Sequence, residues 1–375
     1  MANKDPESIA KSIKAVAEKG NPKAQYALGL LYASGQGVKK NQRHAFLWYQ
    51  KAAEQNLPEA QCILGSKYFH GQGVDKDFKQ ALRWYGKAAE QGDISAQYYL
   101  ATMYEQGDGV PKDAYQAEYW YHRAAELGHP KSQFKLGLIF EKIQAPMALP
   151  WYEKAAEQGL VEAQRLLGHK YITGDGVGQD AKKALAWYQK AAEQNDAVAQ
   201  WNLGMMLAKG AGCKRDDNKA VFWLKRSAVQ EFSPALSALA LYWAQGVGGV
   251  KNLKLASELW LKAAERGDAE AQHNLARLFY SGGKGVARDL AAAWLWFERA
   301  AAQGILESQL QLGLIHARGD TGAVNLVEAY KWFSLASTHP AAKANLERAS
   351  SLMSKSQLAE GRRLSKEWAK AFHKR

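Results

Sequence analysis

The chain has 375 residues, and no run of apolar residues is long enough to cross a membrane or to form a signal peptide. Most of the formal net charge of +13 lies at the two ends, because residues 1–56 contribute +5 and residues 341–375 contribute +6. A groove that follows a nucleic-acid backbone is basic along its length, so this distribution disfavours nucleic acid as a partner. The two cysteines, Cys62 and Cys213, are too few for a disulfide framework.

Residues 1–23 predict an N-terminal capping helix, equivalent to half a repeat, over about residues 8–20. From Ala24 to residue 340 a unit of about 36 residues then recurs nine times. One leucine, followed by glycine in six units and by alanine in three, marks each unit, at Leu28, Leu64, Leu100, Leu136, Leu167, Leu203, Leu239, Leu275 and Leu312. Such a period is typical of stacked supersecondary units, so we expect one elongated all-α domain, an α/α superhelical solenoid.

Each unit predicts two helices joined by a turn, as residues 22–56 illustrate. Asn21 offers an N-cap for helix A, and the glycines of the Gly-x-Gly-Val turn that starts at Gly35 end that helix. Asn41 offers the N-cap of helix B. On both helices apolar and small residues recur at spacings of three and four, which places them on one buried face.

One position of helix B carries tryptophan in eight of the nine units. The residues are Trp48, Trp84, Trp120, Trp151, Trp187, Trp223, Trp296 and Trp332, with Leu259 as the exception. A ladder of tryptophans could stack on a substrate. The regular alanines and leucines beside them favour packing in the core instead.

These repeats resemble the Sel-1-like repeat family, a helical solenoid branch related to tetratricopeptide repeats. The segment LGSKYFHGQGVDKDFKQALRWYGKAAEQGDISAQ, from Leu64 to Gln97, is similar to the consensus of that family almost throughout. The resemblance covers residues 24–340 and implies a bacterial adaptor that binds a protein or peptide on its surface. Some secreted members carry a disulfide in each repeat and are linked to cell-wall or β-lactam chemistry, and this chain lacks those cysteine pairs.

The fourth repeat is five residues shorter than the others and lacks the glycine turn. Proline in a helix interior loses a hydrogen bond and clashes one turn back. We therefore expect helix B of this repeat to begin between Pro146 and Pro150, with a local change of superhelical curvature.

Residues 341–375 predict basic capping helices at the C-terminus. Ser354 and Gln357 form a capping-box pattern, so a terminal helix is expected from about residue 355. Trp368 and Phe372 could dock on an acidic partner or a membrane surface, but the spacing favours packing on the last repeat.

No pattern of catalytic, cofactor-binding or metal-ligating residues is present: the nine histidines form no zinc motif, and no phosphate-binding loop appears. The informative positions are those that vary on one face of helix A, which by analogy with tetratricopeptide repeats lines the concave groove. Aromatic and arginine side chains suit recognition of a peptide, although they could also pack between neighbouring A helices. The candidate partner-binding residues on this face are Tyr26, Tyr98, Phe134, Arg165, His169, Trp201, His273 and Arg277.

The expected function is that of a non-enzymatic protein-interaction scaffold in the cytoplasm, with a protein or peptide partner and no small-molecule substrate. Two other classes remain open. One is a periplasmic or secreted protein acting on cell-wall or β-lactam compounds, which would need a leader and a convergent Ser/Lys or Glu site. The other is an RNA-binding helical repeat, which would need basic pairs recurring in the groove.

Overall fold

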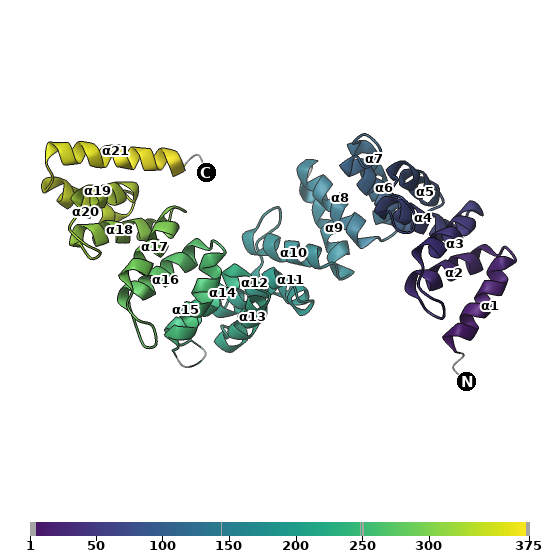
Figure 1. Cartoon of the computed structure of the whole chain (residues 1–375), viewed down its shortest axis with the longest axis horizontal. Coiled ribbons are helices and arrows are strands. Elements are labelled where there is room, and N and C mark those ends of the chain that lie inside the picture. Colours follow the sequence, from purple (N-terminus) through teal and green to yellow (C-terminus); the bar gives the residue numbers. More distant parts are fainter. Residues whose placement is uncertain (1–4, 144, 248, 250, 373–375) are drawn as a thin grey trace. The chain divides into compact units, whose positions relative to one another are not determined.

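The computed structural model describes residues 5–143, 145–247, 249 and 251–372. In this part of the chain 21 helices and no strand are present, and helices make up 75% of the described residues (Figure 1). The chain divides into two compact units, residues 1–180 and 181–375. The boundary between them falls inside the fifth repeat. The predicted all-α solenoid is confirmed.

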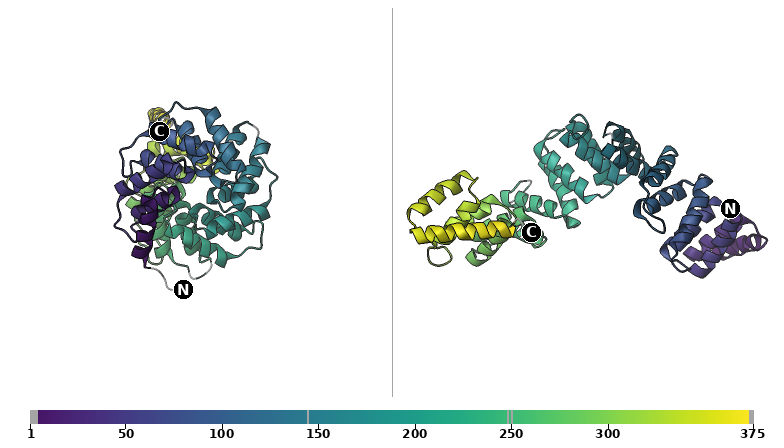
Figure 2. Two further views of the ribbon diagram at one scale, coloured as in Figure 1. Left: turned by 90° about the vertical axis from the view of Figure 1, so that its right-hand side faces the viewer. Right: turned by 90° about the horizontal axis from the view of Figure 1, so that it is seen from above.

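Unit 1 holds a first single helix and four complete helical hairpins, followed by the A helix of the fifth repeat. The helices are α1 (Pro6–Glu18), α2 (Pro22–Ser34), α3 (Gln42–Glu54), α4 (Pro58–His70), α5 (Phe78–Glu90), α6 (Ile94–Gln106), α7 (Ala114–Glu126), α8 (Pro130–Ile143), α9 (Ala145–Glu157) and α10 (Val161–Thr173). From α2 onward the even-numbered helices are the A helices and the odd-numbered ones the B helices. Within unit 1 each helix from α1 to α9 contacts the next along the chain, so the hairpins stack in order (Figure 2).

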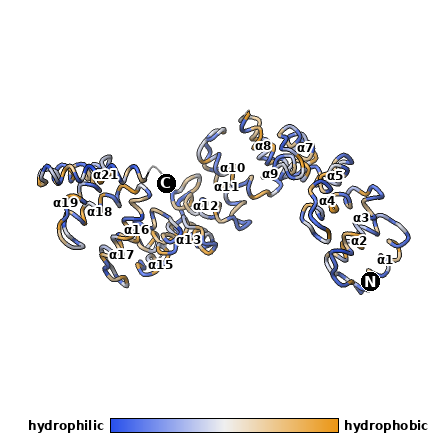
Figure 3. Tube along the Cα trace, turned by 45° about the horizontal axis from the view of Figure 1, so that its top comes forward, coloured by the Kyte–Doolittle hydropathy of each residue, from blue (hydrophilic) through white to orange (hydrophobic). Residues whose placement is uncertain are grey.

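Unit 2 continues the same alternation. Its helices are α11 (Ala181–Glu193), α12 (Ala197–Lys209), α13 (Asp217–Val229), α14 (Ser233–Gln245), α15 (Leu253–Glu265), α16 (Ala269–Ser281), α17 (Leu290–Ala301), α18 (Leu306–Arg318), α19 (Leu326–Leu335), α20 (Pro340–Ser351) and α21 (Lys355–Phe372). Hydrophobic and hydrophilic residues alternate along these helices rather than gathering in one segment (Figure 3). Among the described residues, no helix combines the length and apolarity that a membrane span needs.

The predicted helix ends are confirmed. The Asn21 side chain accepts a hydrogen bond from the Ala24 amide at 3.0 Å, and Asn41 caps α3 in the same way. Gly35 ends α2 with a φ of 85°, a left-handed conformation that costs glycine no steric penalty. At the other end of the chain, the Ser354 amide donates to Gln357 at 2.9 Å and the Gln357 amide donates to the Ser354 hydroxyl at 3.2 Å. This capping box starts α21.

The core position of helix B is the residue after the tryptophan. Tyr49 and its counterparts Tyr85, Tyr121, Tyr152 and Tyr188 are at most 1% exposed. The ring of Tyr49 lies against Gly29, where an added Cβ would come within 2.6 Å of it, which explains the glycine of the Leu-Gly pair. Trp48 is only half-buried, and the Lys51 ammonium lies 4.4 Å above its ring. The predicted core packing of the tryptophans is confirmed for Trp84, Trp120, Trp296 and Trp332, which are buried, while the aromatic residue after each tryptophan is the more deeply buried of the two in most repeats.

In the fourth repeat helix α9 begins at Ala145, directly before the range from Pro146 to Pro150 that the sequence predicts for its start, and Pro150 lies inside the helix. At the C-terminus, the rings of Trp332 and Trp368 lie 5.5 Å apart, so Trp368 packs on the last repeat as predicted. The Phe372 side chain lies outside the described part. Cys62 and Cys213 are both free thiols.

Candidate functional site

The eight predicted residues all lie on A helices. Tyr26, Tyr98, Phe134, Arg165 and His169 belong to unit 1, and Trp201, His273 and Arg277 to unit 2. Six of them are half-buried, while His169 and Arg277 are exposed. Only His273 and Arg277 lie on the same helix of unit 2, one turn apart on α16.

The aromatic members of this set pack within the chain. The rings of Tyr98 and Phe134 lie 6.0 and 5.7 Å from Tyr121 and Tyr152, the core tyrosines of their own repeats. Tyr26 packs on Tyr49 in the same way, and Trp201 contacts Phe232 of the next repeat. These four aromatic residues therefore take part in packing within the chain. Each of them is half-buried, so part of its side chain remains at the surface.

His273 also has partners in the chain. Its Nδ1 lies 2.8 Å from the Ser308 hydroxyl on α18, and its ring lies 5.7 Å from Phe297. Burial, with a contribution from the Arg277 guanidinium, lowers the pKa of His273 to about 4. The imidazole is therefore neutral at physiological pH and joins two repeats, a role that its residue type did not predict.

In unit 1 the carboxylate of Glu105, on an A helix, lies within hydrogen-bond distance of the core tyrosine Tyr121. The Tyr121 hydroxyl donates to Glu105 at 2.8 Å, and Lys135 of the next A helix donates to both Glu105 oxygens at 2.8 and 3.0 Å. Burial alone would raise the pKa of Glu105, but the hydrogen bonds from Lys135 and Tyr121 outweigh it and hold the pKa below its usual value. The hydrogen bonds among these three side chains thus connect two successive repeats.

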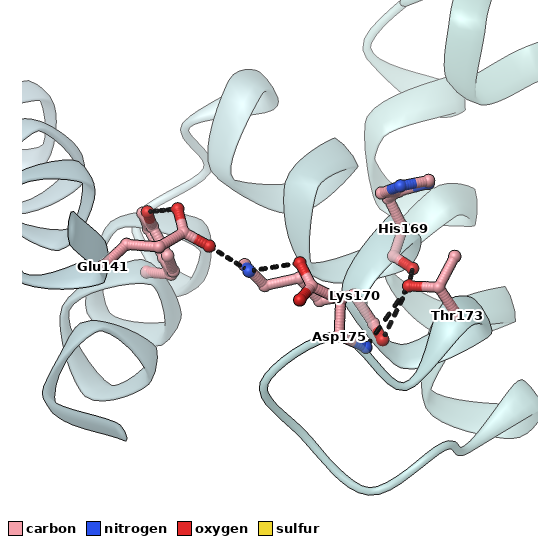
Figure 4. A network of polar contacts seen from close by, with 6 residues as sticks. Glu141, His169, Lys170, Thr173 and Asp175 are labelled. Atoms are coloured by element: carbon pink, nitrogen blue, oxygen red, sulfur yellow. Dashed lines mark hydrogen bonds and ion pairs between the residues drawn. The ribbon is translucent and has the colours of Figure 1, made fainter. Parts of the chain in front are cut away.

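A second network of this kind joins the fourth and fifth repeats (Figure 4). Glu141 accepts from the Tyr152 hydroxyl at 2.7 Å and from Lys170, which also bonds Asp175 at 3.0 Å. Burial would raise the pKa of Glu141, and the bonds from Lys170 and Tyr152 lower it below its usual value. His169 lies beside this network, but its ring points away from it (Figure 4).

Acid is expected to weaken unit 1 as the pH falls below about 4.5, the ordinary pKa of glutamate. The folded-state pKa values of Glu105 and Glu141 are depressed, so these groups stabilise the fold above that pH and lose the contribution as they are protonated. Urea denaturation at pH 7 and at about pH 3.5 measures the loss. The double variant E105Q/E141Q should lose less stability between these pH values than the wild type, and an equal loss would contradict the assignment.

Unit 2 contains a groove of about 440 Å³ on the same A-helix face, which we call the α16 groove. Its walls come from α14, α16 and α18, the A helices of the last three repeats, and α15 and α17 contribute Trp260 and Phe297. Arg277, one of the eight predicted residues, lines it together with Tyr280 of the same helix. Tyr280 donates to Asp320 at 2.6 Å. The α16 groove is thus a depression on the A-helix face that was predicted to bind a partner.

Several polar groups in the α16 groove lack partners. Among the described residues, neither the Arg277 guanidinium nor the Asn274 side-chain amide makes a hydrogen bond or an ion pair. Trp260 is 5% exposed, and its indole Nε1–H has no acceptor in the described part of the chain. Sequence reasoning missed Trp260 and Asn274. The available signal was the pair Leu259-Trp260, which stands where five other repeats have Trp-Tyr.

A larger cavity of about 670 Å³ lies elsewhere in unit 2, between α11, α12 and α13. It contains several basic residues, but two of them are already paired with acidic neighbours. Arg215 bonds Asp217 at 2.9 Å, and Lys219 lies 3.5 Å from Asp216. Arg215 and Lys219 are thus neutralised locally, and no described residue that lines this cavity carries a buried polar atom without a partner, as Trp260 does in the α16 groove. Among the described residues, no group of three or more His, Cys, Asp or Glu side chains could hold a metal ion.

Comparison with known proteins identifies the repeat. The Sel1 repeat family matches nine segments, residues 22–57, 58–93, 94–129, 130–160, 161–196, 197–230, 233–268, 269–305 and 306–339. No curated protein sequence matches the chain.

Two solved structures share the fold over most of their length. One is a protective antigen of uropathogenic Escherichia coli strains that displays an SLR fold, with 31% identity, a TM-score of 0.70, and coverage of 99% of this chain and 89% of that one. The other is a Sel1 repeat protein from Oxalobacter formigenes, with 28% identity, a TM-score of 0.58, and coverage of 84% and 94%. The chain therefore belongs to the Sel1 repeat family, whose helical solenoid commonly serves as a protein-interaction scaffold.

Proposed function

We propose that this protein is a non-enzymatic scaffold and that the α16 groove binds a peptide segment of a partner protein. The observation that carries the proposal is the coincidence of a groove of about 440 Å³ with an exposed Arg277 that has no acidic partner among the described residues. Arginine is enriched at protein interfaces, where its planar head binds carboxylates and carbonyls. The proposal includes a reducing compartment such as the cytoplasm, which the free thiols of Cys62 and Cys213 support.

The groove also offers apolar contact area of the kind that peptide binding needs. Leu241 on α14 is 40% exposed and lines the groove. Phe297 and Leu278 lie at its base among otherwise buried residues. A segment that covers these side chains would bury apolar surface while its polar groups meet Arg277 and Asn274.

Site-specific photo-crosslinking tests this function. A photoreactive phenylalanine analogue is placed at Leu241 in the groove or at Leu295 on α17, which is equally exposed at 40% and does not line the groove. In cells that make the protein, we expect the Leu241 probe to crosslink a discrete protein that the Leu295 probe misses. The substitution R277E should weaken that adduct. Identical adducts at both positions, or none at Leu241, would overturn the proposal. Cell fractionation of the same samples checks the compartment.

A further inference from the structure

The repeat register places three positions of unit 1 in correspondence with three positions of the α16 groove. Glu105 lies five residues after Leu100, and Ala244 lies five residues after Leu239. Tyr121 and Trp260 both occupy the core aromatic position of helix B. Lys135 and Asn274 each directly precede the leucine of the following repeat. The triad Glu105–Tyr121–Lys135 therefore corresponds to the triad Ala244–Trp260–Asn274.

In unit 1 this triad is complete. The Glu105 carboxylate accepts hydrogen bonds from the Tyr121 hydroxyl and the Lys135 ammonium at 2.8–3.0 Å. The carboxylate is the only acceptor of the three, and the other two groups are donors that converge on it. The positive charge of Lys135 balances its negative charge.

In unit 2 the donors are present and the carboxylate is not. Ala244 has no polar side chain, whereas Trp260 keeps an N–H donor and Asn274 keeps an amide. All three residues line the α16 groove. The Trp260 Nε1–H is buried and has no acceptor among the described residues, so its capacity to donate a hydrogen bond is unused. Arg277, which lines the same groove, supplies the positive charge that Lys135 supplies in unit 1.

We infer that the α16 groove receives an aspartate or glutamate side chain from the partner protein, and that this carboxylate takes the place that Glu105 fills in unit 1. It accepts from the Trp260 Nε1–H and the Asn274 amide and pairs with Arg277. This inference rests on the function proposed above and adds the chemistry of the ligand.

One feature favours an acidic side chain over the C-terminal carboxylate of a chain. The groove continues past the triad on both sides, since Gln245 on α14 and Gln311 on α18 also line it. A peptide that runs across α14, α16 and α18 therefore presents a side chain at the triad while its backbone meets the two amides. The sixth repeat lacks this arrangement, because Leu224 stands at its aromatic position and Ala238 precedes its next leucine.

The Trp260 indole N–H reports directly on the inference. In ¹⁵N-labelled full-length protein its cross-peak is assigned by its loss in W260F, a variant that the fold accepts because Phe297 and Phe333 occupy the same position in later repeats. The probes are N-acetyl-glutamate methylamide and the neutral N-acetyl-glutamine methylamide. We expect the glutamate probe to move the Trp260 peak downfield and the glutamine probe to leave it in place. No movement, or equal movement with both probes, would overturn the inference.

A second test introduces the carboxylate into the chain itself by substitution. The variant A244E should move the Trp260 peak downfield without added probe, abolish the response to the glutamate probe, and raise the melting temperature. The matched control A208E introduces the same side chain at the equivalent half-buried position of the sixth repeat, where donors are lacking, and should lower the melting temperature. If A244E destabilises as much as A208E, the inference is wrong. If the A244E test fails but the Leu241 probe still crosslinks a partner, the proposed scaffold function stands and only the inference of a carboxylate ligand is rejected.

Discussion

Replacing Tyr121 with alanine is expected to lower the free energy of unfolding by about 3–5 kcal/mol, the range measured for large aromatic residues cut back to alanine in a core. Tyr121 is fully buried, at 0% exposure, and its ring packs 6.0 Å from that of Tyr98. Its hydroxyl also donates to Glu105 at 2.8 Å. The substitution therefore removes both a core side chain and one donor of the Glu105 network.

Two further variants separate these contributions. Y121F keeps the ring and removes only the hydroxyl, so it should cost about 1 kcal/mol. Y119A truncates a neighbour on the same helix that is 51% exposed, and it should change stability by no more than about 0.5 kcal/mol. Urea denaturation followed by circular dichroism measures all three variants. Equal losses for Y121A and Y119A would show that the core does not depend on this position.

Most of the fold could be predicted from the sequence because the repeat makes each local signal recur. Caps such as Asn21 and Asn41, the left-handed Gly35 and the capping box at Ser354 are local features, and all are confirmed. Depth of burial could not be predicted in the same way. Periodicity assigns Trp48 and Tyr49 to the buried side, but only the packing shows that Tyr49 fills the space above Gly29 while Lys51 covers Trp48.

The candidate site was predicted only in part. The variable face of helix A pointed to Arg277, which does line the α16 groove. Trp260 and Asn274 were missed because Trp260 occupies, and Asn274 directly precedes, a recurring skeleton position that the sequence assigns to the core. The groove itself depends on a missing side chain, since Ala244 stands where the third repeat has Glu105. The alanine at position 244 can be interpreted only once the structure shows that Glu105 accepts hydrogen bonds from Tyr121 and Lys135.

Pro150 presents the clearest conflict between local sequence and structure. It lies inside α9 at an exposed position, although proline lacks the amide hydrogen that a helix interior uses and its ring crowds the carbonyl one turn back. The corresponding residue in the next repeat, directly before Trp187, is Ala186. The helix therefore forms here because packing outweighs an unfavourable residue, and Tyr152, which is 0% exposed, anchors it.

The substitution P150A should consequently raise the free energy of unfolding by about 2 kcal/mol, since the gain in helix stability exceeds the entropy that the unfolded chain recovers without proline. The matched control is P58A. Pro58 is the first residue of α4, where no amide hydrogen is needed, so replacing it should not raise the free energy of unfolding. Urea denaturation of both variants decides the matter. If P150A brings no gain over P58A, the first turns of α9 contribute no helical stability in solution, and helix B of the fourth repeat begins at Pro150, the last position of the range that its sequence predicts.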